Sequence, residues 1–242
     1  MYNTVIFDLD DTLIDNFQNV KNAFKEVLKY RNEEYTEEKF KNFFELDKEF
    51  WSKRAKGEIV DPIKFDSIQK KTEWIRAKRF LIYFNDEISY EEAVRINDLY
   101  IDALSYNIVP IEGAFDIVRY LNEKKYKIIV ATNGPILAIK SKLKACKIDE
   151  YVDFIFSAEE AGHMKPKKEF FEGLFKKIGS SDTSKMIIIG DELEKDIKGG
   201  IDNNIDTCWF NRKFKNRYTD EQIKMYPHKY EITRLEELKE IL

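Results

Sequence analysis

The chain has 242 residues, of which 43% are hydrophobic and 36% charged, a composition typical of a globular protein with a proper core, in one large domain or two modest ones. Its 41 basic and 45 acidic residues are interspersed and sum to a net charge of −4, so there is no basic footprint for a nucleic acid polymer. No apolar stretch approaches the roughly 20 residues of a membrane helix, so no membrane partner is expected.

The first predicted element is a buried strand that runs directly into carboxylates. Residues 5–13 read VIFDLDDTL, where β-branched and aromatic residues precede Asp8, Asp10 and Asp11. Crowded carboxylates repel one another, so this arrangement lowers stability unless a cation or a reaction requires it. Two interpretations follow: an acidic turn after a strand, or a metal site that contains a nucleophile.

A separate helical domain is predicted after this strand, over residues 16–107. The next predicted strand ends at Thr132, more than a hundred residues beyond Asp8, which is too far for a crossover helix. The segment shows helical periodicity and no convincing strand. Its many aromatic residues are predicted to form a core rather than a base-stacking platform, and Arg76 and Arg79 are expected to be exposed.

The rest of the chain alternates short apolar runs with helical patterns. The runs are apolar at consecutive positions, as in strands that are buried on both faces of a parallel sheet. The alternation predicts an α/β domain, residues 1–15 with 108–242, whose parallel sheet has helices on both faces. Further strands are predicted in 127–134, 185–192 and 206–210, helices in 115–121, 135–147 (starting at Pro135) and 168–179 (ending at Gly179), and a short strand and a helix in 230–242.

Polar side chains gather at the ends of the predicted strands, where ligands bind in an open parallel sheet. On an extended strand, Asp8 and Asp10 point the same way, roughly 6–7 Å apart, and Asp191 from another strand end can complete a cluster of oxygens. Such oxygens are the ligands that Mg²⁺ prefers, and a bound phosphate then needs neutral donors and a cation. Thr132, the amides that follow it and Lys165 match that need.

Each of these residues also has a purely structural explanation. Lys165 fits a solvated basic loop, and Thr132 can cap the helix that follows it. Asp191 and Asp196 are carboxylates of the kind favoured at a helix start. These explanations account for the residues one at a time, and poorly for four strand-end clusters in a single chain order.

Four motifs in this order, FDLDDT, TN, KP and GDELEKD, resemble those of the haloacid dehalogenase superfamily. The resemblance covers the whole chain, and it implies a Rossmann-like core with an all-helical cap domain, residues 16–107, inserted after the first motif. The segments TNG, GDELEKDIKGGIDNNIDTCWFN and YEITRLEELKEIL are most similar to the bacterial pyrimidine 5′-nucleotidase branch.

The resemblance implies a catalytic pair and a metal site. Asp8 would be the nucleophile that forms an aspartyl-phosphate, and Asp10 would be the general acid and then the general base. Mg²⁺ would be held by Asp8, by the backbone carbonyl of Asp10 and by Asp191. Because Asp10 is present, the chain does not resemble the dehalogenating and phosphonate-cleaving members, which lack this aspartate.

The resemblance also assigns the phosphate site. Thr132, the Asn133 amide and Lys165 would hold the phosphate, and Asp196 would contact the metal or Lys165.

The function expected is a Mg²⁺-dependent phosphatase of small phosphomonoesters, with nucleoside 5′-monophosphates the preferred substrates. Sugar-phosphate phosphatases and phosphomutases share every motif and remain alternatives, as does a module that only binds a phosphate ligand. The partner expected is a small phosphorylated metabolite, and the oligomeric state stays open.

A cytoplasmic location is expected. The first strand begins at about residue 4, which leaves no room for a secretory signal. Cys146 and Cys208 are the only cysteines, so a disulfide framework is not expected, and each is predicted to be a small buried hydrophobic residue.

Overall fold

The computed structural model divides into two compact units, Met1–Phe17 with Ile108–Leu242 and Gln18–Asn107. The domain boundaries predicted from the sequence, 15/16 and 107/108, differ from this division only at the first. Pro135, the predicted helix start, lies outside the described part of the chain. The structure describes residues 2–60, 65–134, 136–212 and 218–242.

The first unit is built on a six-stranded sheet, in which every pair of neighbouring strands is parallel. The strand order is β3-β2-β1-β4-β5-β6. Strands β2 and β3 lie on one side of β1 and β4 to β6 on the other, so the direction in which strands are added reverses at β1. This confirms the predicted Rossmann-like parallel sheet. The strands are β1 Thr4–Phe7, β2 Lys127–Thr132, β3 Phe154–Ser157, β4 Met186–Gly190, β5 Asp206–Phe210 and β6 Tyr230–Ile232.

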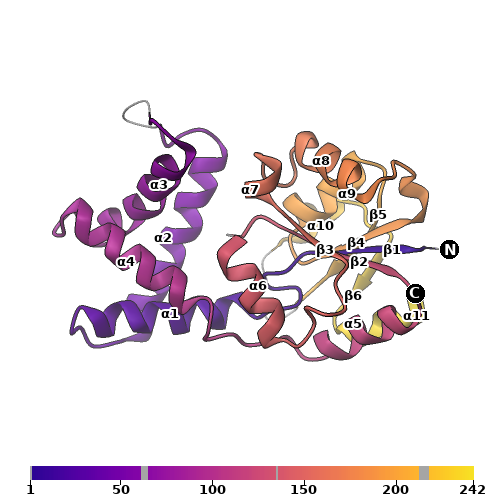
Figure 1. Cartoon of the computed structure of the whole chain (residues 1–242), viewed down its shortest axis with the longest axis horizontal. Coiled ribbons are helices and arrows are strands. Elements are labelled where there is room, and N and C mark those ends of the chain that lie inside the picture. The colour runs from indigo at the N-terminus through magenta and orange to yellow at the C-terminus, as the bar shows by residue number, and fades with distance from the viewer. Residues whose placement is uncertain (1, 61–64, 135, 213–217) are drawn as a thin grey trace. The chain divides into compact units, whose positions relative to one another are not determined.

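Helices cover both faces of this sheet (Figure 1). Successive side chains of a strand point to opposite faces, and so Val5 and Phe7 pack in one core while Ile6 packs in the other. The first core includes residues of α5, α6 and α11, and the second includes residues of α8. The helices of this unit are α5 Ala114–Glu123, α6 Ile136–Ala145, α7 Ala158–Ala161, α8 Lys168–Ile178, α9 Lys198–Asp202, α10 Asp220–Met225 and α11 Leu238–Ile241.

Two details of this unit bear on the sequence predictions. Helix α8 ends at Gly179, which has φ +77°, and this confirms the predicted glycine cap. Strand β3 was not predicted from the sequence. It is an outermost strand of the sheet. The Lys177 ammonium donates to the Ile155 carbonyl at 2.9 Å, and a charged side chain at an edge strand hinders its pairing with another chain.

The second unit contains four helices in its described residues, and a polar side chain caps three of them. Thr36, Ser67 and Ser89 each accept a hydrogen bond from a backbone N–H in the first turn. The aromatic rings pack on one another, with Phe43 stacked between Phe24 at 4.5 Å and Phe80 at 5.6 Å. The predicted aromatic core is therefore confirmed. The helices are α1 Asn16–Tyr30, α2 Glu37–Ala55, α3 Ile68–Tyr83 and α4 Tyr90–Ala103.

The expectation that Arg79 is exposed is wrong. Its side chain is 4% exposed, and its two terminal nitrogens donate to Asp47 Oδ1 at 2.7 Å and to Asn97 Oδ1 at 3.2 Å. Arg79 lies one helical turn after the buried Ile75, and thus on the inner face of α3. The guanidinium also lies over the ring of Tyr100, 4.7 Å from its centroid, so α2, α3 and α4 share one buried polar contact.

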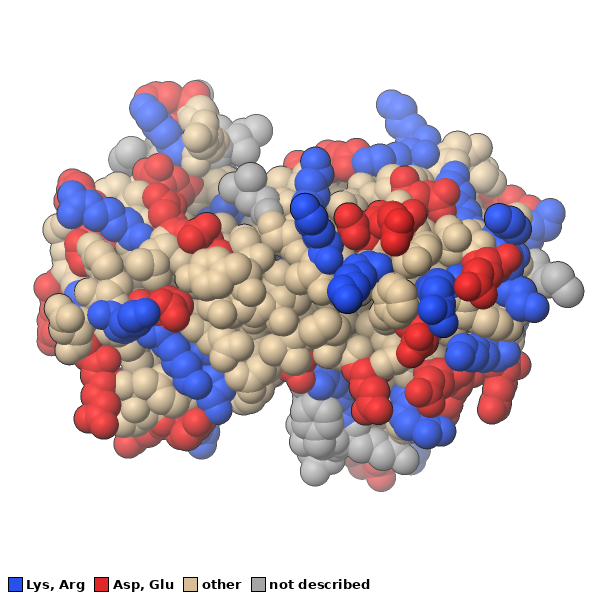
Figure 2. Space-filling model, turned by 60° about the horizontal axis from the view of Figure 1, so that its bottom comes forward, with Lys and Arg blue, Asp and Glu red and all other residues tan. Residues whose placement is uncertain are grey.

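The surface carries both signs of charge. On the face shown in Figure 2, Lys and Arg side chains are interspersed with Asp and Glu, without a large area of one sign. Among the described residues, no helix has the length and apolar character that crossing a membrane requires.

Both cysteines are free and buried, as predicted. Burial raises the pKa of the Cys146 thiol to about 11 and that of Cys208 to about 12. At pH 8, three or more units below these values, we expect the native protein to react with a thiol reagent at a negligible rate, because the thiolate is the nucleophile. Both thiols should react in denaturant, and fast titration of either one in the native protein would contradict the buried placement.

Candidate active site

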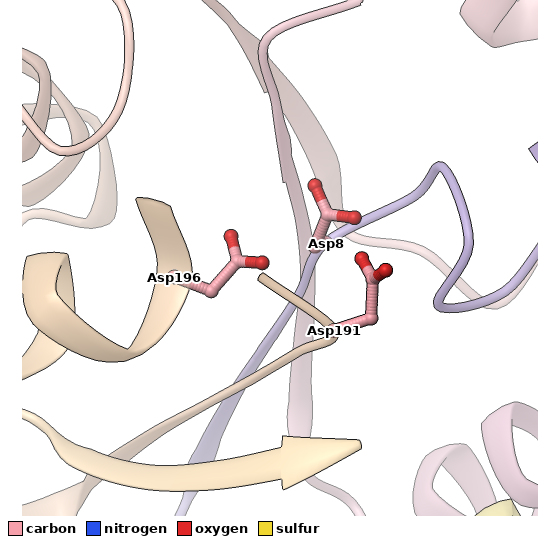
Figure 3. Close-up of side chains that lie close together, drawn as sticks. All are labelled: Asp8, Asp191 and Asp196. Carbon is pink, nitrogen blue, oxygen red and sulfur yellow. The ribbon is translucent and has the colours of Figure 1, made fainter. Parts of the chain in front are cut away.

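Three carboxylates converge at the carboxyl ends of the strands (Figure 3). Asp8 and Asp191 directly follow the neighbouring parallel strands β1 and β4, so both side chains emerge where these strands end. Asp196 comes from the π-helical turn Leu193–Ile197 that follows β4. One oxygen of each carboxylate lies within 4.8 Å of the others, and all three residues are buried. The predicted meeting of Asp8 and Asp191 at one edge is therefore found.

Lys165 lies against this cluster. Its ammonium donates to Asp8 Oδ1, to Asp196 Oδ1 and to the Ala131 carbonyl, each at 2.7 Å. The residue is 3% exposed, so the solvated-loop explanation is wrong for Lys165. Burial by itself lowers the pKa of this ammonium, but the two carboxylates outweigh burial and hold the pKa well above its ordinary value.

Asp8 is a buried carboxylate with a raised pKa. Burial raises its pKa to about 7, with a further upward contribution from the charges of Asp196 and Asp10 and an opposing one from Lys165. The Thr12 hydroxyl donates to Asp8 Oδ2 at 3.2 Å. Three buried carboxylates therefore gather beside the Lys165 ammonium. Hard oxygen donors clustered in this way fit a hard divalent cation such as Mg²⁺.

The loop after β2 holds the Lys165 loop in place. Asn133 Oδ1 accepts from the Lys165 backbone N–H at 2.8 Å, and Asn133 Nδ2 donates to the Lys165 carbonyl at 3.2 Å. Thr132 is the last residue of β2, and its Oγ1 accepts from the Gly134 N–H at 3.0 Å. This bond orders the turn before α6. Two predicted phosphate-site residues, Thr132 and Asn133, therefore lie at the end of β2 and directly after it, next to Lys165.

Asp10 lies just beyond the end of strand β1. Strand β1 ends at Phe7, and the chain turns at Asp11, which has φ +68°. The Asp10 carboxylate is not in the three-carboxylate cluster found among the described residues. Its Oδ1 accepts from the Lys142 ammonium on α6 at 2.5 Å. Asp8 and Asp10 thus contact different lysines, Lys165 and Lys142.

Two residues at the site were missed by the sequence analysis. Lys142 interrupts an apolar stripe formed by Ile139 and Leu143 of α6 and by Cys146 just after it, and a charge at a core position is a signal that could have found it. Arg212 follows β5, and its guanidinium donates to Asp11 Oδ1 at 3.1 Å and to Asp15 Oδ2 at 2.9 Å. Arg212 carries no local pattern that predicts this contact.

Gly190 is the glycine of the last motif, and the site leaves no room for a side chain there. A Cβ at this position would lie 2.2 Å from Asp196 Oδ2 and 2.3 Å from Asp196 Cγ. Asp196 cannot easily withdraw, because its Oδ1 accepts from Lys165 and its Oδ2 from the Glu192 N–H at 3.1 Å.

We therefore expect Gly190→Ala to lower the free energy of unfolding by about 1–3 kcal/mol, measured by urea denaturation. Gly162→Ala in the loop before Lys165 is a useful contrast. A Cβ there meets nothing within 4 Å, although its φ of +71° adds backbone strain. A Gly190→Ala protein as stable as wild type would contradict the close packing of Asp196 against Gly190.

Comparison with known proteins identifies the family. Residues 2–203 match the model of the haloacid dehalogenase-like hydrolases. The chain belongs to this family. The predicted resemblance is thus confirmed, as is the prediction of a hydrolase.

Relatives span nearly the full chain. The HAD-hydrolase YfnB of Bacillus subtilis is 28% identical over 100% of this chain and 95% of its own. Its magnesium-bound crystal structure, described as revealing interdomain movement, matches with a TM-score of 0.83 over 100% of this chain and 98% of that one. The pyrimidine 5′-nucleotidase YjjG of Escherichia coli is 26% identical over 98% of this chain and 96% of its own.

A glyceraldehyde 3-phosphate phosphatase of Pyrococcus abyssi is 23% identical over 87% of this chain and 82% of its own. The names of these relatives agree with the predicted enzyme class, a phosphoric monoester hydrolase.

Proposed function

We propose that this hydrolase of the haloacid dehalogenase-like family is a Mg²⁺-dependent phosphatase of small phosphomonoesters. The observation that carries the proposal is the buried contact of Lys165 with Asp8 and Asp196, next to Asp191. A nucleophilic carboxylate, a cation and further acidic ligands are the parts that phosphoryl transfer needs.

The two free thiols suit a reducing compartment such as the cytoplasm.

In this mechanism Asp8 attacks the phosphorus in line. A bond forms between an Asp8 oxygen and phosphorus, and the bond between phosphorus and the ester oxygen breaks. Asp10 gives its proton to the departing alkoxide, which leaves as an alcohol. Water then attacks the aspartyl-phosphate and gives a proton to Asp10, which releases inorganic phosphate and restores both carboxyl groups.

The remaining residues hold the reacting groups. Lys165, the Thr132 hydroxyl and the backbone amide of Asn133 would bind the phosphoryl oxygens. Asp8, Asp191 and the Asp10 backbone carbonyl would hold Mg²⁺. When bound, Mg²⁺ would offset the negative charge that gathers on the phosphoryl oxygens. The two oxygens of Asp196 accept from Lys165 and from a backbone N–H, so its role is to orient Lys165.

The preferred substrates under this proposal are nucleoside 5′-monophosphates, and residues 18–107 act as the cap that selects among them. The pyrimidine 5′-nucleotidase among the relatives supports this class, because it matches over 98% of the chain. Sugar phosphates are the second candidate, supported by the more distant glyceraldehyde 3-phosphate phosphatase.

The test is release of inorganic phosphate from a panel of nucleoside monophosphates and sugar phosphates, with Mg²⁺ and again with EDTA. We expect Mg²⁺-dependent turnover that is highest on pyrimidine monophosphates. Highest turnover on a sugar phosphate would support the phosphatase reaction but would change the proposed substrate class from nucleoside monophosphates to sugar phosphates. No release from folded protein with Mg²⁺ would overturn the phosphatase, and isomerised sugar phosphate in the same samples would then identify a mutase.

A further inference from the structure

Lys142 is a buried lysine on α6 that none of the proposed roles includes. Its side chain is 3% exposed, and its ammonium lies 2.5 Å from Asp10 Oδ1. Its neighbours at helical spacing are Ile139 and Leu143 of α6 and Cys146 just after it, which belong to a core of the α/β unit. An ammonium at such a position loses its hydration, so an apolar residue of similar length would serve packing better.

The contact with Lys142 leaves the two oxygens of Asp10 in different surroundings. Oδ1 accepts from Lys142. Oδ2 lies near Gly134, where a Cβ added to the glycine would be 3.1 Å from it and 3.3 Å from Thr132 Oγ1. Asp10 Oδ2 and the Thr132 hydroxyl therefore lie on the same side of Gly134. One oxygen is anchored, and the other is presented at the loop that we assign to the phosphate.

We propose that Lys142 is a positioning residue for Asp10, which fixes the carboxylate so that Oδ2 faces the ester oxygen of the bound phosphomonoester. The proposal rests on the proposed function, since it assigns Lys142 through the acid–base role of Asp10. Asp10 otherwise has a side chain that is 24% exposed and can turn about its side-chain torsions. Misplacement of a catalytic group by about 1 Å can cost on the order of 10²-fold in rate.

The test compares Lys142→Met with wild type on two kinds of ester. An alkyl phosphate, such as a nucleoside monophosphate, leaves as an alkoxide that needs a proton, and an aryl phosphate with an acidic phenol leaves without one. In single-turnover phosphorylation of Asp8, we expect a loss of about 10- to 100-fold on the alkyl ester and little loss on the aryl ester. Lys142→Arg should recover part of the alkyl-ester rate.

A double variant separates positioning from a general disturbance of the site. Because Lys142 acts through Asp10, Lys142→Met should cost nothing further in an Asp10→Asn background, whereas distortion of the site would add its cost in both backgrounds. Lys140→Met is the matched control, since Lys140 is an exposed lysine on the same helix, and it should match wild type on both esters.

The outcomes are distinct. Equal losses on both esters, a further loss in the Asp10→Asn background, or no loss at all would overturn the role of Lys142. If wild type itself releases no phosphate from either ester, the proposed function fails instead. Should Lys142→Met not fold, Lys142→Gln replaces it in the same experiments. Glutamine keeps a hydrogen-bond donor, but its side chain is shorter than that of lysine and carries no charge.

Discussion

Asp8→Asn is expected to lower phosphate release by about 10³-fold or more, because the amide cannot attack phosphorus and form the acyl-phosphate. The measurement is steady-state phosphate release with Mg²⁺ on the best substrate of the panel. Trapping of acid-stable radioactive phosphate on the protein should fail as well. Asp149→Asn is the control, since Asp149 is exposed, and it should keep full activity.

The same variant should remain folded. Burial already disfavours the charged form of Asp8, whose pKa is raised to about 7, so a neutral amide of the same shape is tolerated there. Lys165 keeps its contact with Asp196 at 2.7 Å. Thermal unfolding within a few degrees of wild type is expected. A variant that keeps more than a tenth of the wild-type rate would exclude Asp8 as the nucleophile.

Lys165→Met is expected to damage both stability and activity. It leaves Asp8 and Asp196 buried without their shared ammonium, and removing one partner of a buried ion pair costs about 3–5 kcal/mol. Urea denaturation in EDTA measures this loss. Phosphate release should fall by about 10²-fold or more, because the phosphoryl oxygens lose their cation.

Added Mg²⁺ should restore part of the stability of Lys165→Met, because a divalent cation bound to the native state offsets the uncompensated carboxylates. Lys168→Met supplies the contrast: Lys168 is exposed and pairs with Glu172 within one helix, a contact worth less than about 1 kcal/mol. Equal stability of Lys165→Met and wild type in EDTA would contradict the buried network.

Much of the fold could be predicted from local patterns. The runs before Asp8 and Asp191 are apolar at consecutive positions, as is typical of strands covered on both faces, and both are buried strands of the sheet. Strand β3 was not found in this way, although Phe156 and Ser157 are buried like the residues of the predicted strands. Arg79 was misjudged because the sequence does not reveal its partner Asp47, which comes from another helix.

The sequence by itself determined the parallel sheet, the helical insertion and the residues at the strand ends, because strand periodicity and motif order are local properties. Only the tertiary structure decided which charges meet. Lys165 is 31 residues from Asp196 and 157 from Asp8, and Lys142 is 132 from Asp10. Contacts of that separation depend on which strands become neighbours and on where each turn sends a side chain, and no local pattern records either.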